Sequence, residues 1–103
     1  MNRIYMDNAA TTRVTEPVFE AMKPYFCEKF GNPMSVHSFG RESRRAVEEA
    51  RRQVAAALNA DSREIYFTGC GTESDNWALR GAAYARGNTR RTLVTTTIEH
   101  HAI

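Results

Sequence analysis

Residues 68–76 read TGCGTESDN, a glycine-rich turn that stands between two differently patterned segments. The apolar residues before it, EIYF at 64–67, predict a short buried strand. After it, residues 75–84 have the pattern of a helix, which the Gly-Asn pair at 87–88 would end. A run of β-branched residues, TLVTTTI at 92–98, predicts a second strand. This order of elements indicates a βαβ unit, the usual start of a parallel sheet in an α/β fold.

The glycine turn is also a candidate anion site. Glycines let a ligand approach the backbone, and the first N–H groups of a helix attract negative charge. Gly71 and Thr72 stand where such a turn meets its helix, and the threonine adds a hydroxyl. The pattern differs from the nucleotide-binding glycine motifs, so a single phosphate monoester fits better. An ordinary turn, in which Thr72 caps the helix and Asp75 supports it like a capping box, explains these residues equally well.

Three histidines are candidates for chemistry. His100 follows the second predicted strand, and open α/β sheets bind ligands at the carboxyl ends of their strands. Its ring could stack on an aromatic cofactor or transfer protons near neutral pH. His100 and His101 are a poor metal pair, because neighbours on a strand point to opposite faces. His37 is interpreted as a surface histidine, and the same interpretation remains open for the other two.

The first half of the chain is expected to be helical. Thr15 is a candidate N-cap, with Pro17 in the first turn, and the helix should end near Phe30 because Gly31 and Pro33 follow. Its apolar stripe consists of Val18, Phe19, Met22, Tyr25 and Phe26.

A second helix is expected from about Phe39 to Leu58, with Ser38 as its N-cap and Glu48 facing Arg52. One side of it is lined by Val47, Ala50, Val54, Ala57 and Leu58. Parallel strands need several neighbours and covering helices. Two strands and three helices do not supply them, so we expect the opening of a larger domain.

Composition narrows the class of protein. The chain has 103 residues, 42% hydrophobic and 25% charged, which is typical of a globular domain. Its net charge is +2, and the arginines of 41–52 alternate with glutamates, so we expect no nucleic-acid partner. We also expect no membrane partner and a cytoplasmic location, since no long apolar run or signal-like start is present. Cys27 and Cys70 suggest neither a disulfide nor a zinc site, and Cys27 is expected to be half-buried.

Four linked motifs carry a family resemblance. They are IYMDNAATTRV at 4–14, FGNPMSVHSFG at 30–40, REIYFTGCGTESDNWAL at 63–79 and IEHHAI at 98–103. In this order and spacing they resemble the N-terminal quarter of cysteine desulfurases of the NifS/IscS type. Those enzymes use pyridoxal 5'-phosphate (PLP) and belong to the class V aminotransferases, with fold type I.

The resemblance implies an architecture. The chain would be an N-terminal fragment of the PLP-dependent transferase fold type I, with two or three helices before the first strand-helix-strand unit of the large domain. Residues 1–63 would form the N-terminal arm and helices of the small domain, and residues 64–103 would begin the PLP-binding domain. The family also implies a homodimer.

Site residues follow from the same resemblance. Gly71 and Thr72 would hold the PLP phosphate. His100 would stack on the pyridine ring and take part in proton transfer, as the catalytic residue of this segment. Asn8 and Ala9 would line the substrate pocket, and no metal is implied.

The resemblance also implies what this segment lacks. The family's Schiff-base lysine and persulfide-forming cysteine lie downstream of residue 103, and neither Lys23 nor Lys29 matches the lysine. Cys70 lies in the phosphate turn and is interpreted as a small residue that fits there. This segment alone should therefore not desulfurate cysteine.

The implied activity is conversion of L-cysteine to L-alanine. Sulfur would pass as an enzyme persulfide to an iron–sulfur scaffold or a thiolation acceptor, for iron–sulfur cluster assembly or thiolation. Three alternatives stay open: a non-catalytic PLP- or phosphate-binding module, a truncated subunit that pairs with a full-length partner, and a selenocysteine lyase or other class V enzyme.

Overall fold

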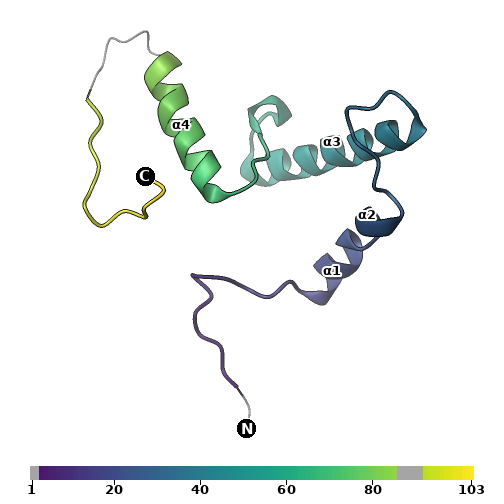
Figure 1. Ribbon diagram of the computed structural model, residues 1–103, viewed down its shortest axis with the longest axis horizontal. Coiled ribbons are helices and arrows are strands. Elements are labelled where there is room, and N and C mark those ends of the chain that lie inside the picture. Colours follow the sequence, from purple (N-terminus) through teal and green to yellow (C-terminus); the bar gives the residue numbers. More distant parts are fainter. Residues whose placement is uncertain (1–2, 86–91) are drawn as a thin grey trace. The chain divides into compact units, whose positions relative to one another are not determined.

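A computed structural model of the chain describes residues 3–85 and 92–103. Its helical elements are shown in Figure 1 and are α1 (Glu16–Met22), α2 (Pro24–Cys27), α3 (Ser38–Leu58), the short 3-10 helix η1 (Ser62–Glu64) and α4 (Gly71–Ala85). The chain divides into two units, Met1–Ser62 and Arg63–Ile103. The assignment of these parts to a small and a large domain stays a prediction.

The first predicted helix is split in two. Thr15 is the N-cap of α1 and a proline follows in the first turn, as expected, although the Thr15 side chain makes no capping hydrogen bond. The helix does not continue to Phe30, because Pro24 interrupts it: α1 ends at Met22, and α2 runs only to Cys27. Proline lacks an N–H and its ring clashes with the carbonyl of the preceding turn. Cys27 is exposed rather than half-buried.

The loop between α2 and α3 is closely packed. Asn32 closes it twice, since its carbonyl accepts from Ser35 N at 3.0 Å and its side-chain Oδ1 accepts from Met34 N at 2.9 Å. The N-cap of α3 is His37, one residue before the predicted Ser38, and its Nδ1 accepts a hydrogen bond from Gly40 N at 3.4 Å. A side-chain acceptor at this position satisfies an N–H that the helix cannot pair internally.

Helix α3 ends as predicted at Leu58. Asn59 follows in the left-handed conformation, with φ 52° and ψ 43°, a common way to stop a helix. The predicted pair of Glu48 and Arg52 is not formed. Arg52 instead pairs with Glu49, and Arg51 with Glu48, each three residues apart on the same surface. Hydrogen bonds from Arg52 and then Gln53 to the Glu49 carboxylate lower its pKa.

The strands predicted at 64–67 and 92–98 are absent from the described residues. Residues 62–64 form η1, while residues 65–68 and 92–96 belong to no helix or strand. A strand exists through hydrogen bonds to a neighbouring strand, and β-rich composition alone does not supply one. The helix after the glycine turn is confirmed over Gly71–Ala85, and its predicted end at residues 87–88 lies outside the described residues.

Burial is sparse in the part of the chain that the structure describes. Ala55 is its buried hydrophobic side chain, at 3% exposure, and Gly40 and Ser43 are the other buried residues of α3. The predicted apolar stripes are present but largely uncovered, as Phe26 is 70% and Leu58 67% exposed. None of the described helices is long and apolar enough to span a membrane.

Candidate functional site

The glycine turn leads directly into α4. Gly71 is the first residue of this helix, and the first N–H groups of a helix have no acceptor within it. The carboxylate of Glu73 accepts from the backbone N–H of Gly69 at 2.7 Å. Glu73, at the third helical position, thus takes the supporting place predicted for Asp75, although its carboxylate bonds the N–H of Gly69 and not that of Cys70, the residue directly before the helix. Because its carboxylate is engaged at Gly69, the N–H groups of Gly71 and Thr72 remain for another acceptor.

Space at the turn fits a phosphate. A Cβ built on Gly71 would meet no atom within 4 Å, and both Gly71 and Thr72 are exposed. Two backbone N–H groups, a threonine hydroxyl and the positive end of a 15-residue helix are donors suited to a phosphate monoester. The residues present thus fit the phosphate of PLP.

The back of the turn is braced by two hydroxyl groups. The Thr68 and Ser74 hydroxyl oxygens lie 2.6 Å apart. One of the two hydroxyls donates to the other, which leaves the second free to donate to the Cys70 carbonyl, 3.2 Å from the Thr68 oxygen and 3.3 Å from the Ser74 oxygen. The Cys70 backbone is therefore fixed, while Cys70 itself is exposed as a free cysteine.

His100 is exposed and makes two local contacts. Its Nδ1 accepts from the backbone N–H of Ala102 at 3.1 Å. Its ring centroid lies 4.0 Å from that of His101, with the two planes tilted by 33°. With Nδ1 acting as an acceptor, the proton of the neutral ring sits on Nε2. The side chain therefore presents Nε2–H to its surroundings.

Asn76 joins the histidine segment to the glycine turn. Its Nδ2 donates to the Thr72 carbonyl at 3.0 Å and to the Ala102 carbonyl at 3.0 Å. Both Asn76 and Ala102 are partly buried. Sequence reasoning missed this residue, although an amide four positions after Thr72 on a helix is placed to reach back to that turn.

Asn8 and Ala9 lie in the other unit, within a polar turn. The Asp7 carbonyl accepts from Ala10 N at 3.1 Å, and the Tyr5 hydroxyl donates to the same carbonyl at 2.9 Å. Asn8 helps to line an open hollow of about 630 Å³, whose other lining residues are Tyr5, Thr11, Thr12 and Arg13. Ala9 is exposed beside it. The substrate role of Asn8 and Ala9 stays a prediction.

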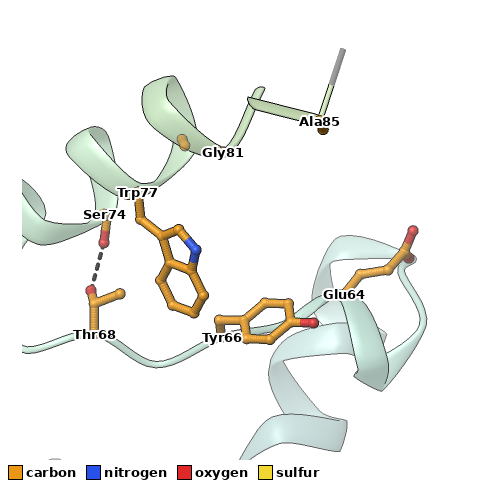
Figure 2. Close-up of a pocket in the computed structure, with 8 residues that line it drawn as sticks. Glu64, Tyr66, Thr68, Ser74, Trp77, Gly81 and Ala85 are labelled. Carbon is orange, nitrogen blue, oxygen red and sulfur yellow. Dashed lines mark hydrogen bonds between the residues drawn. The ribbon is translucent and has the colours of Figure 1, made fainter. Parts of the chain in front are cut away.

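A hollow of the second unit is a different feature from the candidate site. It is an open groove of about 760 Å³ along α4 and is lined by Glu64, Tyr66, Thr68, Ser74, Trp77, Ala78, Gly81 and Ala85. Figure 2 shows Tyr66 directed toward Trp77, and their rings meet edge to face at 5.1 Å. Gly71, Thr72 and His100 are not among its lining residues. Its mostly apolar lining suits packing better than catalysis.

Known proteins match this chain over almost its whole length. The Aminotransferase class-V family matches residues 4–103. The "Cysteine desulfurase IscS" of Dictyoglomus turgidum (strain DSM 6724 / Z-1310) is 52% identical over 100 residues, covering 97% of this chain and 25% of that protein. Its namesake from Methanosarcina thermophila is 51% identical over 100 residues, with the same two coverages of 97% and 25%.

A solved structure agrees with these relatives. A "NifS-like protein" superposes with a TM-score of 0.88 at 46% sequence identity, covering 98% of this chain and 28% of that one. The backbone of the described residues therefore follows that of the corresponding segment of the NifS-like protein. The chain spans about a quarter of the length of the curated relatives that it matches.

Proposed function

The chain belongs to the aminotransferase class-V family, and on this premise we propose that it is the N-terminal part of a PLP-dependent cysteine desulfurase. The observation that carries the proposal is the turn at Gly71 and Thr72, which is open, exposed and tied through Asn76 to the segment that bears His100. A helix N-terminus open to an anion, tied by hydrogen bonds to the segment that carries an imidazole, would provide two of the contacts that PLP needs from its protein.

In this proposal the chain contributes binding and proton handling. The N–H groups of Gly71 and Thr72, together with the Thr72 hydroxyl, bind the phosphate. PLP, when bound, withdraws electrons from the carbon that carries the substrate amine. His100 covers the cofactor ring, and its Nε2 holds or moves a proton while Nδ1 stays bonded to Ala102 N. Asn8 and Ala9 form part of the wall for L-cysteine.

The full reaction would convert L-cysteine to L-alanine. The substrate's carbon–sulfur bond breaks, and the sulfur forms an S–S bond with a cysteine thiolate of the enzyme. Proton transfer to carbon then completes L-alanine. The thiolate and the lysine that binds PLP would come from the part of the protein downstream of residue 103. The persulfide sulfur would pass to an iron–sulfur scaffold or a thiolation acceptor, in a cytoplasmic homodimer.

Retention of PLP by the full-length protein tests this function. Thr72→Val removes the hydroxyl donor at nearly constant volume and should speed PLP release about tenfold, the effect of losing one hydrogen bond to a charged group. Release is followed by the visible absorption of the protein after gel filtration. Thr72→Ser retains the hydroxyl and is the matched control, with release close to that of the unchanged protein.

Three results would decide between the readings. Unchanged PLP release by Thr72→Val would show that the Thr72 hydroxyl does not bind the phosphate. A full-length protein that never binds PLP would overturn the proposed function altogether. If PLP binds but L-cysteine yields no L-alanine, the protein is a non-catalytic PLP-binding module.

A further inference from the structure

We infer that Asn76 is a positioning residue that holds His100 in a fixed place relative to the phosphate turn. The inference rests on the proposed function and extends it to a residue that makes no contact with PLP itself. It starts from one side chain that bonds two backbone carbonyls 30 positions apart in the sequence, those of Thr72 and Ala102.

The two bonds of Asn76 use the full donor capacity of its amide. Nδ2 carries two hydrogens, and its two acceptors, the Thr72 and Ala102 carbonyl oxygens, each lie at 3.0 Å. The reverse orientation of the amide would place Oδ1 against two carbonyl oxygens. The orientation of the side chain is therefore set by its partners. Within the described residues, this amide makes the hydrogen bond that connects α4 with residues 92–103.

Ala102 transmits this constraint to His100. Its carbonyl is held by Asn76, and its N–H donates to His100 Nδ1 at 3.1 Å. Both the N–H and the carbonyl of Ala102 are thus held by hydrogen bonds. The bond from Asn76 is sheltered, because Asn76 and Ala102 are partly buried, whereas the histidine ring is exposed. Asn76 therefore controls where the imidazole lies and supports the tautomer that carries its proton on Nε2.

A fixed spacing is what a cofactor bound at two points requires. The phosphate and the ring of PLP are parts of one small molecule and are joined by a short CH2–O link that limits their separation. The groups that hold them must keep a constant separation, and small misplacements of a catalytic group are costly in rate. Thr72 lies at the phosphate end and His100 at the ring end. Asn76 bonds to the backbone of the first and, through Ala102, to the segment of the second.

A double-mutant cycle in the full-length, PLP-loaded protein tests this role. Asn76→Ala should lower kcat by about tenfold and reduce the visible circular dichroism of bound PLP, because the imidazole is no longer held. PLP release should stay within about twofold of the unchanged protein, since the phosphate donors remain. In a His100→Ala background, Asn76→Ala should change neither kcat nor the circular dichroism further.

A matched control and a second variant keep the test decisive. Arg80→Ala alters an exposed residue one turn further along α4 and should leave all three readouts unchanged. Asn76→Asp retains the size of the side chain but removes its donors. It should give the effects on kcat, circular dichroism and PLP release expected of Asn76→Ala, and it replaces that variant if the alanine protein does not fold.

Several outcomes would overturn the inference. One is an Asn76 effect of equal size with and without His100, which would mark a general structural role. Others are unchanged circular dichroism in both Asn76 variants, or PLP release as fast as in Thr72→Val. If the unchanged protein fails to bind PLP, the proposed function fails first, and this result is distinct from a missing coupling.

Discussion

Gly40 and Gly71 both stand in the first turn of a helix that follows a loop, yet they are glycines for different reasons. A Cβ on Gly40 would lie 2.2 Å from the Ser35 carbonyl oxygen and 2.7 Å from that of Asn32. A Cβ on Gly71 would meet nothing within 4 Å. The first glycine lets two stretches of backbone touch. The second borders open space beside unpaired helix N–H groups.

This difference separates a packing junction from a candidate binding turn. At the start of α3, the loop carbonyls occupy the room that a side chain would take. At the start of α4, that room is open, and the proposed function assigns it to the PLP phosphate. Close approach of the backbone requires glycine at position 40, whereas the open space at Gly71 would admit a Cβ, and the sequence alone does not distinguish the two positions. Substitutions at Gly40, Ser43 and Gly71 test this difference.

The largest effect is expected for Gly40→Ala. Its Cβ would overlap backbone atoms, which cannot move aside as a flexible side chain can. We expect a loss of about 1–3 kcal/mol in the stability of α3. The measurement is amide hydrogen exchange of the first turns of α3 in the full-length protein, where faster exchange reports easier opening.

Gly81→Ala is the matched control for that substitution. Gly81 lies inside α4, and its added Cβ would reach ordinary contact at 3.9 Å from Trp77 Cδ1. Alanine is the better helix former there by up to about 1 kcal/mol, so exchange of the α4 amides should slow. Unaltered exchange of α3 in Gly40→Ala would mean that the junction is not closely packed.

The fold could be predicted from sequence where local chemistry decides it. The start of α1 at Thr15 and the end of α3 before Asn59 follow from capping and left-handed turn preferences. Pro24 is a local signal too, although the apolar stripe on either side of it favours one continuous helix. The strands could not be predicted this way. The composition of EIYF and TLVTTTI indicates only a β propensity, whereas a strand forms only with a neighbouring strand.

The candidate site divides along the same line. The glycine turn and the histidine were predicted from residue type and position. The similarity to known cysteine desulfurases supports the family of the chain. Asn76 was not predicted, because its importance comes from a carbonyl at Ala102 that only the three-dimensional structure brings to it. The capping role moved from Asp75 to Glu73 because the helix begins earlier than its pattern suggested.

Ser43→Ala should have a smaller effect, and of opposite sign to that of Gly40→Ala. Ser43 is buried at 7% exposure, and its hydroxyl has no hydrogen-bond partner. Its removal should stabilise α3 by about 1 kcal/mol, because an unpaired buried hydroxyl is costly. Slower amide exchange in α3 would show this gain. Ser38→Ala, at the exposed first residue of the same helix, should change the stability of α3 little. An equal gain in stability from both substitutions would show that the buried hydroxyl of Ser43 is not its cause.

The smallest effect is expected for Gly71→Ala, the counterpart of Gly40→Ala. The Cβ enters open space, and alanine loses less backbone entropy than glycine on folding, so α4 should become more stable by about 0.4–1 kcal/mol. PLP release should stay close to that of the unchanged protein, because the N–H groups proposed to bind the phosphate are backbone groups and alanine retains them. Exchange of the α4 amides and gel filtration of the PLP-loaded protein measure the two effects. Rapid loss of PLP from this variant would show that the space beside Gly71 must stay free of a methyl group. The two glycines would then share a packing requirement, one toward protein backbone and the other toward the ligand.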